Sequence, residues 1–299
     1  MSLWIIFTLL AAFAQNVRSA LQRSLAGDLT ATGASYVRFL YGLPFAALYL
    51  FVLLQVTGEA TPQLNTTFVL SILIGGAAQV VAAVLLVRMF ALRVFTVGTT
   101  YSKTETVQTA LIGFLVLGEV VGPYAFAGIL ISFIGVLALS VARTAVTPRA
   151  ILTSLGSPVA LMGLGCGAGF AIASVCYRAA SLALEDNGFA VSAATTLTAV
   201  LIWQTLIMSV WLGLRDRASL KQSYVRWRPA LAVGIASVIG SIGWFTAFAL
   251  ENAAYVKALG QIELVFALAT STLIFKEKTN RAELLGIGLV VAGLVLIVI

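Results

Sequence analysis

Apolar runs of about 17 to 25 residues follow one another along almost the whole sequence, and this is the length at which a helix crosses the hydrocarbon core of a bilayer. A transmembrane β-barrel would instead show strands of about 10 residues that alternate in polarity. The composition agrees: 10% of the residues are charged, against about 25% in soluble domains, and the mean hydropathy is +1.05. We therefore expect an all-α polytopic membrane protein.

The Gly, Pro and charged residues between the apolar runs divide the chain into ten predicted transmembrane helices. These cover residues 3–24, 33–55, 67–89, 95–117, 121–142, 158–182, 190–213, 229–250, 254–275 and 280–299. Most connections are short, apart from the loops near Arg143–Gly156 and Arg215–Arg228. The first of these loops contains Pro148 and is the seam between residues 1–150 and residues 151–299.

The two parts of the chain repeat one pattern at a fixed offset. Glu263 follows Glu105 by 158 positions, and Glu277 follows Glu119 by the same 158 positions. The same offset pairs Phe90, Ala91 and Leu92 with Phe248, Ala249 and Leu250, Gly128 with Gly286, and Gly135 with Gly293. Since each repeat has five spans, an odd number, the second repeat enters the membrane in the opposite direction. The expected architecture is two inverted five-helix repeats, at residues 1–150 and 151–299.

Basic residues gather on one side when the loops are assigned alternately to the two sides of the membrane. That side collects Arg23, Arg88, Arg93, Arg143, Arg149, Arg215, Arg217, Lys221, Arg226, Arg228, Lys276, Lys278 and Arg281. The other side has Arg178, with Lys257 near a helix end. Short loops rich in Lys and Arg stay in the cytoplasm, so both termini are predicted to lie outside the cytoplasm.

Two carboxylates fall within apolar segments, at Glu105 and Glu263. A charge at mid-membrane costs at least about 2.5 kcal/mol and is a functional hypothesis by default. Lys103 is two residues from Glu105 and faces another way on a helix, so each needs a partner elsewhere. Lys257 and Gln261 are four apart and can meet. The functional interpretation is a midplane substrate site; the alternative is that buried pairs of the acids with Arg38 or the lysines only lock the helices together.

Aromatic side chains lie near the expected midplane, at Tyr101, Trp203 and Trp244. They are candidates to line a cavity that accepts apolar substrate side chains, in which burial contributes about 25 cal/mol per Å². Packing against lipid or other helices is the alternative role for such residues. With Lys103, Glu105, Lys257, Gln261, Glu263 and Arg38, they make up the predicted substrate-binding set.

Each repeat ends with a span that closes in Glu and is followed by a glycine-spaced span: LVLGE with GILISFIGV, and LIFKE with GIGLVVAGL. Arg38, Phe39 and Leu40 form an RF-type signature early in the second span. In these features the chain resembles the drug/metabolite transporter superfamily, EamA type, and its layout is most similar to the YddG-type amino-acid exporters. The resemblance implies ten helices around a central cavity, alternating access and export of small metabolites. Many members carry Pro in the fourth and ninth spans, which this chain lacks there.

Enzyme chemistry has little support in the sequence. The chain has no His for a Ser/His pair and no GxSxG motif, and its aspartates, Asp28, Asp186 and Asp216, fall in loops. No metal site or cofactor is expected, because Cys166 and Cys176 lie ten residues apart in one apolar run. The basic loop joins two spans near lipid headgroups, which argues against nucleic acid as a partner.

We therefore expect a secondary transporter that exports a small neutral or zwitterionic metabolite, an amino acid with a large apolar or aromatic side chain. Its expected partners are the small-molecule substrate and membrane lipid, and a monomer is compatible with the sequence. The alternatives are broad-specificity efflux of lipophilic cations and a non-transporting membrane scaffold.

Overall fold

The structure is a computed structural model that describes residues 2–24, 30–90, 95–142, 156–184, 186–273 and 280–299. Every regular element in these ranges is a helix. The expected boundary between residues 150 and 151 lies outside the described ranges. So do several residues of the repeat and of the charge pattern, namely Ala91, Leu92, Arg93, Arg143, Arg149, Lys276, Glu277 and Lys278.

The chain forms two compact units, and each draws on both halves of the sequence. Unit 1 consists of Met1–Val80 and Cys176–Glu251, and unit 2 of Val81–Val175 and Asn252–Ile299. Unit 1 contains α1 (Leu3–Ser24), α2 (Ala31–Thr57), α9 (Phe189–Arg215), α10 (Arg217–Val225) and α11 (Trp227–Leu250). Unit 2 contains α4 (Phe95–Ser102), α5 (Glu105–Leu117), α6 (Pro123–Ala142), α12 (Ala253–Leu259), η1 (Gly260–Ile262), α13 (Glu263–Leu273) and α14 (Arg281–Val298). Helices α3 (Thr66–Phe90) and α8 (Pro158–Leu182) contribute to both units.

The offset found in the sequence is also present in the helix bounds. The first residues of α2 and α9, of α4 and α12, of α5 and α13, and of α6 and α14 are each 158 positions apart. The same secondary structure is therefore built twice along the chain.

Seven helices of the described residues are long and apolar enough to cross a membrane: α2, α3, α6, α8, α9, α11 and α14. Helix α1 has a shorter apolar stretch, Leu3–Ser19. The segments 95–117 and 254–275, each expected as one membrane span, are divided into shorter helices near their middle. The chain is a multi-pass membrane protein by the length and composition of its helices.

The basic segment 215–228, expected as a loop, contains the helix α10. Asp216 begins it as N-cap, with its carboxylate accepting a hydrogen bond from the Ser219 backbone N–H at 3.0 Å. The Thr30 hydroxyl donates to the same carboxylate at 3.2 Å. The bond from Ser219 satisfies one orphan donor of the first turn, and this local capping explains why the polar segment is helical.

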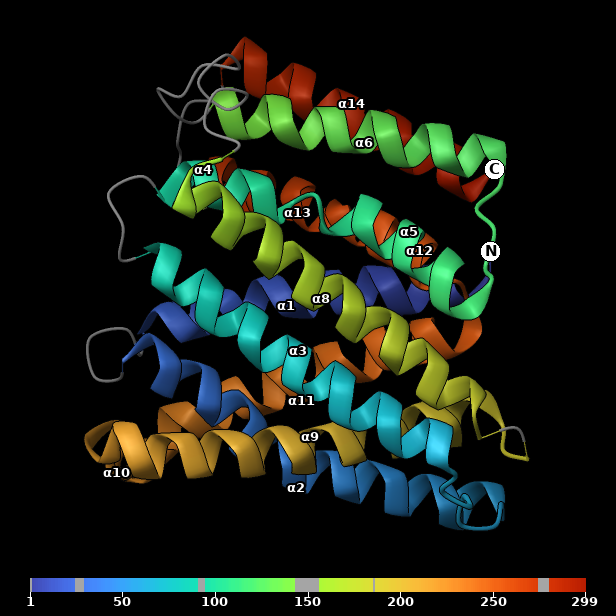
Figure 1. Cartoon of the computed structure of the whole chain (residues 1–299), viewed down its shortest axis with the longest axis vertical. Helices are drawn as coiled ribbons and strands as arrows, with labels where there is room; N and C mark the ends of the chain where they lie inside the picture. The colour runs from blue at the N-terminus through green and yellow to red at the C-terminus, as the bar shows by residue number, and fades with distance from the viewer. Residues whose placement is uncertain (1, 25–29, 91–94, 143–155, 185, 274–279) are drawn as a thin grey trace. The chain divides into compact units, whose positions relative to one another are not determined.

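In unit 1, the repeat-related helices α2 and α9 pack against each other (Figure 1). The Thr198 hydroxyl of α9 donates to the Ala46 carbonyl of α2 at 3.2 Å. The start of α2 lies beside α10, which follows the end of α9. Just after the end of α2, the Glu59 carboxylate accepts a hydrogen bond from the Gly188 N–H at 2.8 Å, where α9 begins. The two helices therefore run antiparallel.

In unit 2, α14 packs along α6 through glycines (Figure 1). A Cβ added at Gly128 would lie 2.6 Å from the Gly293 carbonyl oxygen, and one added at Gly135 would lie 2.7 Å from the Gly286 carbonyl oxygen. Only glycine permits so close an approach of two backbones, which is a common way for membrane helices to gain contact area. The order of these contacts shows that α6 and α14 are antiparallel.

Candidate functional site

Two helix breaks in unit 2 position the charged residues predicted from the sequence. Between α4 and α5 the chain makes three-residue turns, with Lys103 N–H donating to the Thr100 carbonyl at 3.2 Å and Thr104 N–H to the Tyr101 carbonyl at 3.1 Å. The Thr104 hydroxyl donates to the Tyr101 carbonyl at 2.6 Å and accepts from the Gln108 amide at 2.8 Å. Thr thus bonds to backbone groups that an unbroken helix would use, and no Pro is needed for the break.

The second break is a 3₁₀ turn, η1, between α12 and α13. The helix after each break begins with one of the offset-related acids, α5 with Glu105 and α13 with Glu263. A carboxylate in the first turn of a helix is favoured by the positive end of the helix dipole. Both acids therefore occupy the same local position in their repeats.

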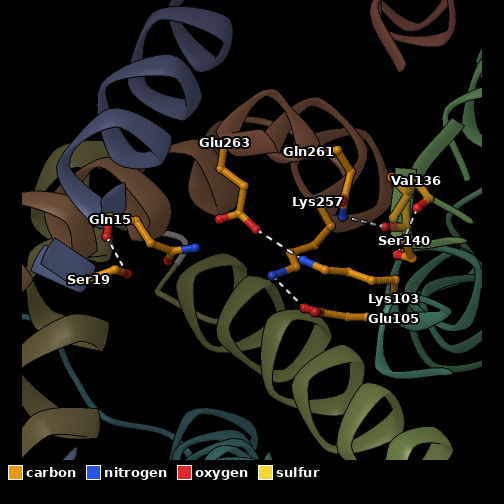
Figure 2. A network of polar contacts seen from close by, with 10 residues as sticks. Gln15, Ser19, Lys103, Glu105, Val136, Ser140, Lys257, Gln261 and Glu263 are labelled. Atoms are coloured by element: carbon orange, nitrogen blue, oxygen red, sulfur yellow. Dashed lines mark hydrogen bonds and ion pairs between the residues drawn. The ribbon is translucent and has the colours of Figure 1, made fainter. Parts of the chain in front are cut away.

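Each acid is paired with a lysine from the other repeat. Lys103 Nζ lies 3.2 Å from Glu263 Oε1, and Lys257 Nζ lies 2.5 Å from Glu105 Oε1. Figure 2 shows the four side chains next to one another, with the two ion pairs dashed. We call Lys103, Glu105, Lys257 and Glu263 the charge quartet. As their spacing predicted, neighbouring Lys103 and Glu105 take different partners.

Neutral polar and aromatic residues surround the breaks. The Gln261 amide donates to the Thr106 hydroxyl at 3.0 Å, which also joins the two repeats. Tyr101 is buried and packs with Ala160 of α8. The prediction that Lys257 meets Gln261 differs from the structure, in which these two side chains take the separate partners Glu105 and Thr106.

Small residues of α8 make room for the first break. A Cβ added at Gly163 would lie 2.8 Å from the Tyr101 Cβ, and one added at Gly167 would lie 2.9 Å from the Ser102 carbonyl oxygen. Gly165, between them, faces Leu85 instead. Glycines four apart thus share the face against α4 and α5, as helical spacing requires.

The quartet contains two cations and two anions, all partly exposed. It offers paired acceptors for an ammonium group and paired donors for a carboxylate. No cluster of His, Cys, Asp and Glu that could hold a metal ion occurs among the described residues. The arrangement is therefore suited to reversible binding of a charged or zwitterionic solute.

The chain is similar to known proteins in part of its sequence and in its fold. Residues 157–299 match the EamA-like transporter family. This family belongs to the drug/metabolite transporter superfamily, and the match suggests transport of small molecules across a membrane. The matched EamA segment includes Lys257, Gln261 and Glu263. No curated protein matches the chain.

One solved protein crystal structure superimposes with a TM-score of 0.71 at 16% sequence identity, covering 98% of this chain and 96% of that chain. At this identity the similarity shows the fold alone. It extends over both repeats, whereas the EamA match covers the second.

The other predicted site residues belong to unit 1. Trp203 of α9 donates its indole N–H to the Leu73 carbonyl at 3.1 Å and covers Gly76. Trp244 of α11 stacks with Phe248 at 6.2 Å between ring centroids. Arg38 of α2 places its guanidinium 4.4 Å from the centre of the Phe39 ring. Both tryptophans have packing partners, and a role for either in a substrate site stays a prediction.

Sequence reasoning missed a buried polar cluster in unit 1. The Tyr177 hydroxyl donates to Gln79 Oε1 at 2.7 Å, and the Gln204 amide donates to the same oxygen at 2.5 Å and to Tyr177 at 3.2 Å. Tyr177 also stacks on Phe245, with ring centroids 4.7 Å apart. In the sequence, Gln79 and Gln204 lie inside apolar runs, and this feature could have predicted the cluster, because a buried amide group needs hydrogen-bond partners.

Proposed function

We propose that the chain is a secondary transporter of a bacterial inner membrane that exports neutral or zwitterionic solutes by alternating access. The proposed substrates are amino acids with large apolar or aromatic side chains. Ten membrane spans, in two inverted five-helix repeats, would place both termini in the periplasm. One copy of the chain contains both repeats, so the proposal requires no second subunit.

The charge quartet carries this proposal. Its formal charges cancel, so the entry of a zwitterion leaves the site neutral, while a charged side chain adds one uncompensated charge. The substrate ammonium group can replace a lysine at Glu105 or Glu263, and its carboxylate can replace an acid at Lys103 or Lys257. Broken helices whose ends meet a solute are a recurrent design of secondary transporters.

The packing in unit 2 supports the inverted repeat. The offset of 158 relates Gly128 to Gly286, and Gly135 to Gly293. A twofold relation between the repeats therefore turns a contact of Gly128 with Gly293 into a contact of Gly286 with Gly135. Both contacts occur, as a twofold relation between α6 and α14 requires. Equivalent helices that pack antiparallel cross a membrane in opposite directions, which is the relation on which rocking of two repeats depends.

Efflux of lipophilic cations is less well supported, because both quartet carboxylates already have lysine partners. A membrane scaffold would gain nothing from four partly exposed charges at two helix breaks. The transport proposal explains why these charges are retained despite the cost of placing them in an apolar segment.

A counterflow screen of the twenty amino acids in proteoliposomes tests the proposal. Burial of a Leu-, Met- or Phe-sized side chain contributes about 1.5–3 kcal/mol, so methionine and phenylalanine should be moved about 10- to 100-fold better than lysine or glutamate. Glu105→Gln and Glu263→Gln should each reduce counterflow more than Glu119→Gln at equal amounts of folded protein. Transport of amphiphilic cations in place of amino acids, or no transport of any solute by folded protein, would refute it.

A further inference from the structure

The basic segment 215–228 carries an excess of positive charge. It contains five basic residues and one acid, Asp216, whose carboxylate accepts hydrogen bonds from Ser219 and Thr30. The basic side chains are all exposed, namely Arg215, Arg217, Lys221, Arg226 and Arg228. Within the described part of the chain, neither Arg217 nor Lys221 has an ion-pair partner.

Helix α10 has an inner and an outer face. Ser219 and Ser223, four residues apart, are buried, and the Ser223 carbonyl accepts a hydrogen bond from the Tyr41 hydroxyl of α2 at 3.1 Å. Arg217 and Lys221 are also four residues apart and therefore share the opposite, exposed face. We call these two residues the α10 basic face.

Both residues of the α10 basic face destabilise the helix unless an anion is near. Like charges four residues apart on a helix repel each other. Arg217 is also in the first turn of α10, where the positive end of the helix dipole disfavours a cation. Its Nε donates to the Gly213 carbonyl at 2.9 Å, which uses one of the five N–H groups of the guanidinium. A phosphate group that accepts hydrogen bonds from Arg217 and Lys221 would offset both effects.

The connections of α10 place it at the boundary of the membrane. Helix α9, which ends at Arg215, and helix α11, which begins at Trp227, are both long and apolar enough to cross the bilayer. A single residue separates α10 from each of them, and α10 packs on both (Figure 1). The α10 basic face therefore lies at the level of the lipid headgroups.

Apolar and aromatic side chains accompany the basic ones. Val225 at the end of α10 and Trp227 at the start of α11 are 58% and 49% exposed. The Arg228 guanidinium lies 5.4 Å from the centre of the Trp227 ring. Trp next to Lys or Arg at the membrane boundary is typical of segments that contact acyl chains and headgroups together. The exposed apolar side chains suit a lipid better than a soluble anion.

We propose that the α10 basic face binds the phosphodiester group of an anionic phospholipid, with Val225 and Trp227 against its acyl chains. This lipid is selected by its charge, unlike the lipid that surrounds the membrane spans. The surface contains no residue of the charge quartet, so the inference does not rest on the transport proposal.

Native mass spectrometry of the full chain in detergent tests the proposal, because it measures the affinity for each lipid molecule bound. The probes are dioleoylphosphatidylglycerol, which has one negative charge, and dioleoylphosphatidylcholine, which has the same acyl chains and no net charge. One Lys or Arg near an anionic lipid strengthens binding by about 5-fold. Arg217→Gln/Lys221→Gln should therefore weaken binding of the first phosphatidylglycerol by about 25-fold. Binding of phosphatidylcholine should not change.

Arg88→Gln/Arg281→Gln is the matched control. Both arginines are exposed, on α3 and α14, and their replacement removes two positive charges on the same predicted side of the membrane. This variant should bind phosphatidylglycerol as the wild type does. Arg217→Lys/Lys221→Arg keeps both charges and should keep the preference for phosphatidylglycerol. If the double Gln variant of α10 fails to fold, the two single Gln variants should each weaken phosphatidylglycerol by about 5-fold.

Three results would overturn the inference. The first is equal affinity of the wild-type protein for the two lipids. The second is equal weakening by the α10 variant and by the control variant, which would make the preference a property of the overall charge. The third is release of bound phosphatidylglycerol by an equal concentration of glycerol 1-phosphate, because the surface would then recognise a free phosphate rather than a lipid.

Discussion

The two ion pairs of the charge quartet should differ in strength, and a pair of double-mutant cycles measures the difference. At 3.2 Å and an effective dielectric constant of about 20, two unit charges attract by about 5 kcal/mol before desolvation. Partial exposure and the cost of desolvation reduce this. The side chains of the Lys257–Glu105 pair are 19% and 15% exposed, against 30% and 24% for the Lys103–Glu263 pair.

We therefore expect a coupling energy of about 2–3 kcal/mol for Lys257–Glu105 and about 1 kcal/mol for Lys103–Glu263, within the range found for contacting residues. The change is Lys→Gln and Glu→Gln, singly and together, which keeps the side-chain shape and removes the charge. The free energy of unfolding is measured by denaturant titration in detergent micelles. In each cycle the double variant should be more stable than the sum of the single effects predicts, because neither single variant has a partner for its remaining charge.

Equal coupling in the two cycles would contradict the assignment of strength by burial. Additive effects in both cycles would show that the pairs do not interact in the folded protein, and the quartet would then not be a site whose charges a solute must displace. A Glu119→Gln variant combined with Lys257→Gln is the control, and it should be additive.

Three further predictions concern packing, pH and topology. Gly135→Ala should lower the melting temperature, because the added Cβ would lie 2.6 Å from the Val290 nitrogen. Gly288→Ala is the control: no atom lies within 4 Å of its added Cβ, so this variant should keep or raise the melting temperature. Hydrogen bonds from Ser219 hold the pKa of the Asp216 carboxyl below its ordinary value of 3.8. The stabilisation by the Asp216 carboxylate is therefore complete above pH 3.8 and is lost as the pH falls through the lowered pKa of the folded protein. In denaturant titrations, Asp216→Ala should lower the free energy of unfolding by about 1 kcal/mol at pH 7 and by little at a pH below the lowered pKa. Ala218→Cys, exposed on α10, should resist a membrane-impermeant maleimide in intact cells and react in inverted vesicles; labelling in intact cells would reverse the proposed topology.

The helices and the repeat were predictable because each depends on local pattern. Apolar runs of bilayer length specify helices almost regardless of context. The separation of 158 positions between Glu105 and Glu263 in the sequence predicted that α5 and α13 begin at equivalent positions. The presence of charged residues within apolar runs also marked the quartet, since such residues carry a cost that demands a reason.

The partners of those residues were not predictable from one sequence. The pairing of Lys257 with Glu105 depends on how two distant segments pack, and spacing along one helix says nothing about it. The helix breaks depend on Thr104 bonding to nearby backbone and on the room left by Gly167 of α8. Grouping into units that combine both halves has the same origin, because it follows from tertiary contacts rather than from the order of the chain.

The acids of the quartet occupy equivalent positions in the two repeats, but the lysines do not. The position equivalent to Lys103 is Gln261, and the position equivalent to Lys257 is Thr99. A site with perfect twofold symmetry would accept an amino acid in two orientations of equal energy, head first or tail first. In the proposed site, the unequal placement of Lys103 and Lys257 would remove this degeneracy, so that a duplicated scaffold would distinguish the two ends of an amino-acid substrate.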